Sequence, residues 1–163
     1  MFALTSPAFA PGSAIPARYT CDGEERSPPL SWVDPPSGTR SLALLVDDPD
    51  APDPAAPRRV WVHWIRYNLP ATITELAEGD GNRAPSAGAR ECLTDAGSVG
   101  YHGPCPPIGR HRYFFHLFAL SQPLPDLGKA ARRADLERAM TGLVLGTAVL
   151  MGTYQRPSAR RAK

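Results

Sequence analysis

The chain of 163 residues has few cysteines and no long apolar run. No stretch is apolar over the roughly 18 residues that a membrane-spanning helix needs, so we expect no transmembrane segment. The N-terminus lacks a basic stretch followed by an apolar run, which argues against a signal peptide. Three cysteines, Cys21, Cys92 and Cys105, are an odd number and do not suggest a secreted disulfide framework. We therefore expect no structural disulfide among them under reducing conditions, and a cytoplasmic location.

Strong charge of either sign is also missing, because the formal net charge is only +2. So small a charge gives no reason to expect a nucleic-acid partner. The P-loop, the dinucleotide fingerprint and the HExxH motif are absent, so we expect no cofactor and no resident metal. The basic residues gather locally at the C-terminus, where Arg156 precedes a tail over residues 157–163. We expect that tail to be solvated and disordered.

Proline and glycine are abundant, with 19 and 14 residues, which indicates a loop-rich and mainly β protein. Four apolar stretches predict strands, and one run of good helix formers predicts a short helix late in the chain. The strands are expected over residues 41–46, 60–69, 112–120 and 144–154, and the helix over residues 130–140. Residues 70–99 are weakly patterned and predict a long excursion with at most one short strand. No internal boundary divides the chain, so we expect a single domain over residues 1–163.

Residues 100–120 form the most informative stretch. Residues 100–109 hold three glycines and three prolines, which predicts a stiff loop, and the following apolar run predicts a strand buried on both faces. His111, Arg112 and Tyr113 lie at the junction. Binding sites are commonly built this way, from polar side chains at loop ends held by a rigid scaffold.

Two further segments carry polar residues at the ends of strong strands. Asp48 and Asp50 belong to a run of three carboxylates in four positions, which taken alone predicts a solvated acidic turn that prolines keep out of a strand ladder. His63 lies in the second strong strand, where the period-two alternation places it on one face with Trp61, Ile65 and Tyr67. A lone histidine on such a face is more often a core residue bonded to a carbonyl than a functional one.

Together these segments resemble a known family. The motifs are Asp48-Pro-Asp-Ala-Pro52, His63-Trp64 with Asn68 five residues on from His63, and Gly100-Tyr-x-Gly-Pro-x-Pro-Pro-x-Gly-x-His-Arg-Tyr113. They look like the motifs of the phosphatidylethanolamine-binding protein family, in its bacterial and archaeal Raf-kinase-inhibitor-like branch. The resemblance runs from about Ile15 to Arg156. The loop over residues 53–60 is longer than the resemblance implies, which we expect to reshape the rim of any pocket.

The resemblance implies an antiparallel β-sandwich with a small helix near the C-terminus. It also implies a non-enzymatic binding or regulatory protein, with a small anion pocket for phosphate-bearing ligands such as a phospholipid headgroup, a nucleotide or a phosphopeptide. A kinase or protease as an inhibited partner, a homodimer and a cis peptide bond at Ala51–Pro52 are implied in the same way. The implied pocket residues are Asp48, Pro52, His63, Gly103, Pro106, His111 and Tyr113. Arg112 is expected to point away from the pocket and, with Asp50, to support the neighbouring loops.

Two alternatives remain open from the residues alone. A hydrolase could use His63 or His111 as a base oriented by Asp48, although no credible nucleophile is evident. Cys105 stands between two prolines and is expected to pack beneath the loop. A metal site could instead form from Asp48, Asp50, His63 and His111. If the pocket binds anions through its histidines, affinity is expected to rise as the pH falls through about 6.5, the reference pKa of histidine.

Overall fold

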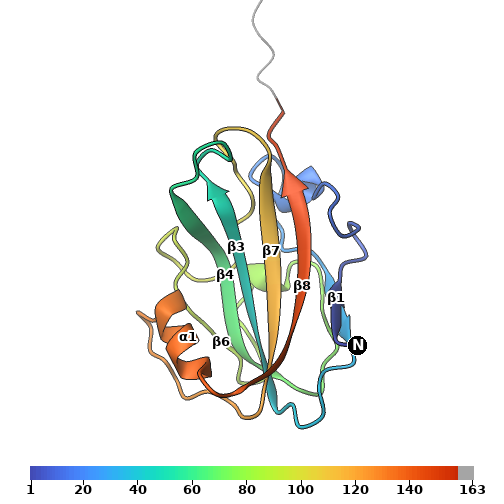
Figure 1. Ribbon diagram of the computed structural model, residues 1–163, viewed down its shortest axis with the longest axis vertical. Helices are drawn as coiled ribbons and strands as arrows, with labels where there is room; N and C mark the ends of the chain where they lie inside the picture. Colours follow the sequence, from blue (N-terminus) through green and yellow to red (C-terminus); the bar gives the residue numbers. More distant parts are fainter. Residues whose placement is uncertain (158–163) are drawn as a thin grey trace, which may run out of the picture.

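The structure, a computed structural model, describes residues 1–157. It is mainly β, with two antiparallel sheets and one α-helix late in the sequence, as the sequence predicts (Figure 1). The strands are β1 (Ala3–Thr5), β2 (Leu30–Val33), β3 (Ser41–Ala51), β4 (Arg59–Pro70), β5 (Glu75–Leu76), β6 (Arg90–Glu91), β7 (His111–Leu120) and β8 (Val144–Tyr154). The helix is α1 (Arg133–Met140), and two 3₁₀ turns are η1 (Ala17–Tyr19) and η2 (Asp80–Asn82). No helix among the described residues is long and apolar enough to cross a membrane.

The larger sheet has the order β6-β4-β3-β7-β8, and the smaller one has the order β1-β2-β5. Between them lies the main apolar core, which joins Trp32 of the small sheet to Leu44, Phe115 and Leu117 of the large sheet. A second core lies on the other face of the large sheet, where α1 buries Leu136 and Met140. Apolar residues on both faces of β3 explain why its sequence is a continuous apolar run.

One prediction for β3 is wrong. The acidic segment is not a solvated turn but the last part of the strand, and Asp47, Asp48 and Asp50 are only 4%, 3% and 6% exposed. β3 pairs with β4 as far as Ala51, and an irregular register between Asp48 and Ala51 accommodates the intervening Pro49. Such a bulge tolerates a proline because the ladder is already interrupted there.

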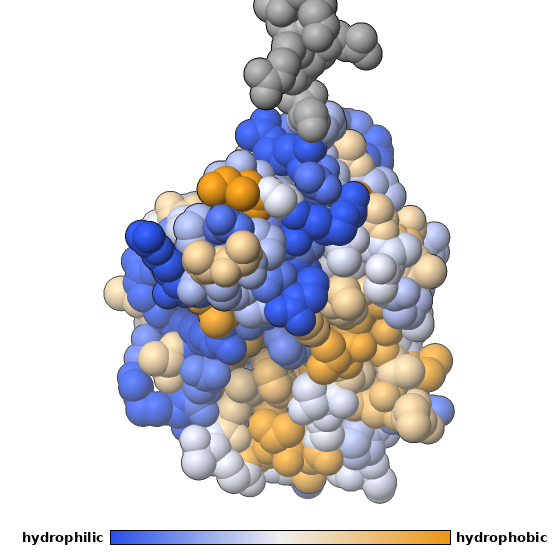
Figure 2. Space-filling view, turned by 45° about the horizontal axis from the view of Figure 1, so that its top comes forward, coloured by the Kyte–Doolittle hydropathy of each residue, from blue (hydrophilic) through white to orange (hydrophobic). Residues whose placement is uncertain are grey.

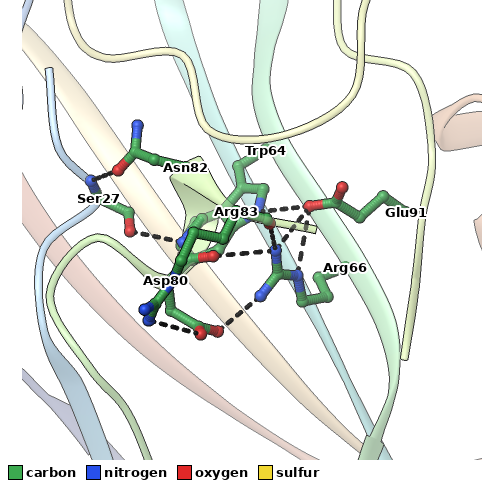
Figure 3. A network of polar contacts seen from close by, with 8 residues as sticks. Ser27, Trp64, Arg66, Asp80, Asn82, Arg83 and Glu91 are labelled. Carbon is green, nitrogen blue, oxygen red and sulfur yellow. Dashed lines mark hydrogen bonds and ion pairs between the residues drawn. The ribbon is translucent and has the colours of Figure 1, made fainter. Parts of the chain in front are cut away.

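The excursion over residues 70–99 contains two short strands, β5 and β6, where at most one was expected. It is fastened to β4 by Arg66, whose side chain is 1% exposed (Figure 3). The guanidinium donates to the carboxylates of Asp80 and Glu91 at 2.6 and 2.9 Å, and to the backbone carbonyls of Asp80 and Arg83. The backbone N–H of Gly81 donates to Ser27 Oγ, and the carbonyl of Gly81 accepts from the N–H of Tyr101. The Arg66 network therefore fixes the segment against which the loop over residues 100–109 rests.

The N-terminal segment closes part of the free edge of β8. Gly12 and Ile15 donate backbone hydrogen bonds to the carbonyls of Met151 and Thr153, and Thr153 donates to Ser13. Gly152 permits this approach, since a Cβ there would lie 2.6 Å from Ile15 and 2.8 Å from Phe9. Just past β8, Arg156 pairs with Asp22 at 2.9 Å, so Arg156 is not part of a frayed tail. The predicted disorder of the tail otherwise concerns residue 157 and residues outside the described range.

Candidate binding cavity

A cavity of about 660 Å³ lies at the end of the large sheet where β3 ends and β7 begins. Figure 1 shows this end of the two neighbouring strands in the upper part of the view. All of the pocket residues implied by the sequence line this cavity, namely Asp48, Pro52, His63, Gly103, Pro106, His111 and Tyr113. They come together because β3, β4 and β7 are neighbours in one sheet and each presents a polar residue near the same end. Residues up to 65 positions apart in the chain therefore meet in one cavity, as the sequence predicts.

His63 reaches the cavity through a β-bulge. Val46 pairs with Trp64 and Asp47 pairs with Val62, so His63 is an extra residue in β4 between two consecutive pairs. The bulge changes the alternation: Ile65 belongs to the core beneath α1, while Trp64 belongs to the core between the sheets. The expectation that His63 and Ile65 share a face is therefore wrong. A bulge next to a binding site commonly re-aims one side chain in this way.

The hydrogen bonds of His63 define which ring nitrogen carries the proton. Nδ1 lies 2.7 Å from the backbone carbonyl oxygen of His102, which can only accept, so Nδ1–H donates and Nε2 carries a lone pair in the neutral ring. The backbone N–H of His102 in turn donates to the carbonyl of His63. Burial lowers the pKa of His63 to about 4. The expected titration near pH 6.5 is therefore wrong for this residue, which is neutral at physiological pH.

His111 is also not a free donor. It is fully buried, with Nδ1 2.6 Å from a carboxylate oxygen of Asp48 and Nε2 2.8 Å from the carbonyl oxygen of Ile108 and 3.1 Å from that of Pro52. Nε2 faces only carbonyl oxygens, so Nε2–H donates to them, and Nδ1 faces the carboxylate of Asp48, whose pKa is raised by burial. The Asp48–His111 pair thus braces the cavity wall. The Ala51–Pro52 peptide bond is cis and lies in this wall.

Tyr113 stands between the two histidines. Its ring lies 5.3 Å from that of His63 in an edge-on arrangement and 6.3 Å from that of His111 in a stacked one. The side chain is 1% exposed, yet its hydroxyl has no hydrogen-bond partner among the described residues. Burial raises the pKa of this phenol, which therefore remains a hydrogen-bond donor at physiological pH. Tyr113 lines the cavity, and a buried hydroxyl without a protein partner commonly marks a place where a water molecule or a ligand binds.

Asp50 and Arg112 do not line the cavity but bond to each other beside it. The Asp50 carboxylate accepts from the backbone N–H and Nε of Arg112 at 2.9 and 3.0 Å, and from Nη2 at 2.9 Å. These bonds lower the pKa of Asp50. They tie the end of β3 to the start of β7, the two strands that carry Asp48 and His111.

We predict that Asp50→Asn lowers the free energy of unfolding by about 1 kcal/mol at pH 7, because a charge-assisted contact with a half-exposed arginine is lost. A carboxyl whose pKa is lower in the folded state stabilises the fold above its unfolded pKa of about 4, and loses that effect as the pH falls through the folded pKa. The difference in the free energy of unfolding between wild type and Asp50→Asn should therefore become smaller below about pH 4. Urea denaturation at a series of pH values measures it. Asp53→Asn, in the adjoining loop, is the control, because the Asp53 carboxylate accepts only the backbone N–H of Ala55 and has no ion pair among the described residues.

The cavity wall includes a disulfide between Cys21 and Cys105, with a sulfur–sulfur distance of 2.04 Å. The predictions of no disulfide and of a Cys105 packed beneath the loop are therefore wrong. Cys105 is exposed, and its partner comes from a turn 84 positions earlier, which no count of cysteines reveals. The odd number arises because Cys92 is buried separately. Since disulfides form in oxidising compartments, the cysteines no longer support the expected cytoplasmic location.

The loop over residues 100–109 is also fixed in place by contacts at Gly103. Its N–H donates to a carboxylate oxygen of Glu25 at 2.9 Å. A Cβ on Gly103 would lie 2.5 Å from the carbonyl oxygen of Tyr19, so only glycine allows this close approach. Tyr101 adds a hydrogen bond from its hydroxyl to the same carbonyl at 2.6 Å. The loop is thus stiff through these contacts as well as through its prolines.

The long loop over residues 53–60 was expected to reshape the rim of the cavity, but the side chains that form the rim were not identified from the sequence. Arg58, Arg59 and Trp61 form this rim, and all three come from the long loop or the start of β4. The Arg59 guanidinium lies 4.7 Å from the Trp61 ring and pairs with Asp95 at 3.0 Å. The feature of the sequence that could have identified the rim is the pair of consecutive arginines, Arg58 and Arg59, in the long loop. Figure 2 turns this end of the sheet toward the viewer and shows hydrophilic residues gathered there, whereas hydrophobic residues gather farther down.

The metal-site hypothesis finds no support in the part of the chain that the structure describes. No group of three or more histidine, cysteine, aspartate or glutamate side chains is arranged there to hold an ion. The candidate ligands already have other partners: Asp48 holds His111, and Asp50 holds Arg112.

Comparison with known proteins agrees with the motifs. A family model described as phosphatidylethanolamine-binding protein matches residues 5–155. A UPF0098 protein of Methanothermobacter thermautotrophicus is 49% identical over 155 residues, which cover 94% of this chain and 98% of the relative.

Two solved structures are similar throughout. One is a putative phosphatidylethanolamine-binding protein homologue, CT736 of Chlamydia trachomatis, with a TM-score of 0.86, 42% identity, and coverage of 96% of this chain and 98% of that chain. The other is YbcL of E. coli, described as a new member of the mammalian family, with a TM-score of 0.85, 31% identity, and coverage of 96% and 99%. The chain therefore belongs to the phosphatidylethanolamine-binding protein family, in its bacterial and archaeal branch.

Proposed function

We propose that this chain is a non-enzymatic binding protein whose cavity takes a phosphate-bearing organic ligand, either a small molecule or a headgroup. The observation that carries the proposal is the unpartnered Tyr113 hydroxyl beside His63, in a cavity with Arg58 and Arg59 at its rim. At about 660 Å³ the cavity lies within the usual range for small-molecule sites, and it is larger than a bare phosphate ion requires. Trp61 and the proline rings offer apolar surface to an organic portion of the ligand.

The geometry does not favour the hydrolase hypothesis. The base oriented by Asp48 would be His111, but Nε2 of His111 donates to backbone carbonyls and cannot take a proton from a nucleophile. Cys105, the one candidate nucleophile in the loop, is in a disulfide and has no thiolate to offer. Inhibition of a kinase or a protease would require a protein-binding surface, whereas the cavity of about 660 Å³ has the size of a small-molecule site.

We predict that O-phosphoethanolamine and adenosine monophosphate bind in this cavity and that Arg58→Ala weakens binding of both by about fivefold to tenfold, the effect of a partly exposed charge contact with an anion. Isothermal titration calorimetry at low salt measures the affinities, and the difference between the two ligands reports whether a headgroup or a nucleotide body fits better. Arg110→Ala, an arginine whose side chain pairs with Thr153 away from the cavity, is the control and should leave affinity unchanged. Equal affinities for wild type and Arg58→Ala would contradict the placement of the ligand in this cavity.

A further inference from the structure

A second cavity, of about 470 Å³, lies beside the start of the loop over residues 100–109. It is formed by the end of η2 and the turn after it (residues 81–85), by Glu91 of β6, and by residues 99–101. Later residues of the same loop line the first cavity instead, and the two cavities share no lining residue in the part of the chain that the structure describes. The volume of the second cavity lies within the usual range for small-molecule sites.

One carboxylate oxygen at this second cavity has no partner among the described residues. The Glu91 side chain is 6% exposed, and its Oε2 accepts from Nε and Nη2 of Arg66 at 3.2 and 2.9 Å and from Nε1 of Trp64 at 3.4 Å. Its Oε1 accepts no hydrogen bond from those residues and is not sealed from solvent. Figure 3 shows the dashed contacts of Glu91 on one oxygen and none on the other. Because Glu91 lines the cavity, a ligand there meets an oxygen with unused lone pairs.

Much of the remaining surface near Glu91 is aromatic or aliphatic. Tyr101 lines the cavity, while its hydroxyl is occupied elsewhere, since it donates to the carbonyl of Tyr19 at 2.6 Å. The Tyr101 ring lies 5.6 Å from that of Trp64, whose indole N–H bonds to Glu91, so the ring and the carboxylate are close neighbours. Val99, which is 49% exposed, adds aliphatic surface. An aromatic ring beside a carboxylate oxygen favours a cation, because both attract positive charge.

The donors around the second cavity already have partners. Arg66, with a side chain 1% exposed, divides its contacts between Glu91 and Asp80. The exposed guanidinium of Arg83 contacts Asp80 at 3.4 Å, and Figure 3 shows its side chain running toward Asp80 and away from Glu91. The Asn82 amide both accepts and donates within the protein. Two guanidiniums and two carboxylates leave this cluster without net charge, so it does not repel a cation.

We propose that the second cavity binds a small primary amine in its ammonium form, with one N–H donating to Oε1 of Glu91 and the charge beside the Tyr101 ring. A charge-assisted hydrogen bond to a carboxylate largely removed from water is the strongest contact that this surface offers. An ammonium group carries three donors and no acceptor, whereas a carboxylate or a phosphate would place its own lone pairs against those of Oε1. The inference does not depend on the proposed function, which concerns the first cavity.

The test compares n-butylammonium with n-butyltrimethylammonium, which have the same charge and the same alkyl chain. Only the first has N–H donors. A titration at pH 7, where a primary amine is protonated, is followed by the ¹⁵N–¹H signals of the tryptophan indoles. The indole of Trp64 donates to Glu91 and should shift, whereas that of Trp61, at the rim of the first cavity, should not. n-Butylammonium should bind at least about tenfold more tightly than its trimethyl analogue, which cannot make the charged hydrogen bond.

The location is tested by Ala84→Phe. Ala84 is an exposed residue that lines the second cavity, so a larger side chain there should fill part of it. The ammonium group would then no longer reach Glu91, and the affinity for n-butylammonium should fall at least about tenfold. Ser86→Phe is the matched control, because it adds the same side chain to an exposed residue of the same turn that does not line the cavity. Glu91 is left intact, since it also holds Arg66.

Each outcome decides the proposal. If neither cation shifts the Trp64 signal, or if the Trp61 signal shifts in its place, the amine does not bind in the second cavity. Equal affinities for the two cations would show that charge and the aromatic ring suffice, which overturns the hydrogen bond to Glu91. Equal affinities of wild type and Ala84→Phe would overturn the location. All of these results leave the proposed function standing, because phosphate-bearing ligands are assigned to the first cavity. A preference for n-butylammonium that Ala84→Phe removes and Ser86→Phe retains supports the proposal.

Discussion

Loss of the Cys21–Cys105 disulfide should lower the free energy of unfolding by about 4–5 kcal/mol. The two cysteines are 84 positions apart, and a cross-link that closes so long a loop removes much of the entropy of the unfolded chain. The double variant Cys21→Ser/Cys105→Ser should show this loss in urea denaturation, as should wild type under a reductant. The reductant should have no further effect on the double variant, which makes it the matched control.

The same bond should matter to ligand binding, because it joins the two segments that form one wall of the cavity. Titration of the unreduced, denatured protein should find one free thiol, that of Cys92. A count of three thiols would show that the disulfide does not form in the purified protein. Wild type that responds to a reductant no more than the double variant does would show that the bond contributes nothing to stability.

The second large effect is expected at Arg66. Arg66→Met keeps much of the side-chain volume but removes the charge that pairs with Asp80 and Glu91. The buried Glu91 then loses its ionic partner, and Asp80 keeps only the exposed Arg83. Breaking a buried ion pair from one side costs about 3–5 kcal/mol, since the remaining charge stays in the interior. The change is measured as a shift in the midpoint of urea denaturation.

Arg83→Ala is the control for Arg66. Arg83 touches the same Asp80 carboxylate, but its side chain is 67% exposed, so its removal should cost less than about 1 kcal/mol. Because the Arg66 network holds the segment that bonds Tyr101, the Arg66→Met variant should also bind phosphate-bearing ligands more weakly. A destabilisation as small as that of Arg83→Ala would mean that solvent reaches the network and replaces the lost contacts.

The sequence predicts the fold class well because the strongest strands, β4 and β7, are long apolar runs between turn-forming residues. The resemblance implies which residues line the cavity, and the alternation along β7 places two of them, His111 and Tyr113, on one face. The prediction fails where a single residue interrupts that alternation. The bulge at His63 moves Ile65 to the opposite face, and apolar patterning cannot locate a bulge when both faces of the strand are buried.

The hydrogen bonds made by the cavity residues are harder to predict than which residues line the cavity. His63 and His111 look equivalent in the sequence, yet one faces a backbone carbonyl and the other a carboxylate and two carbonyls. Every residue type carries a backbone carbonyl, so the sequence does not show which histidine will bond to one. The position of each ring proton can therefore be assigned only from the hydrogen bonds in the folded structure. The Cys21–Cys105 pair is hidden for a related reason, because spacing in the chain does not reveal which cysteines become neighbours.

The segment before η1 has a bearing on how this protein avoids self-association. An edge strand exposes unpaired N–H and C=O groups that can recruit a strand from another molecule. Here Gly12, Ser13 and Ile15 occupy those groups on β8 at Met151 and Thr153. Removing the first 15 residues would leave these backbone groups without partners. It would also expose the surface at Gly152 that Phe9 and Ile15 cover. The N-terminal segment therefore protects the edge of β8 against edge-to-edge aggregation, and a chain that lacks this segment should aggregate more readily than one that keeps it.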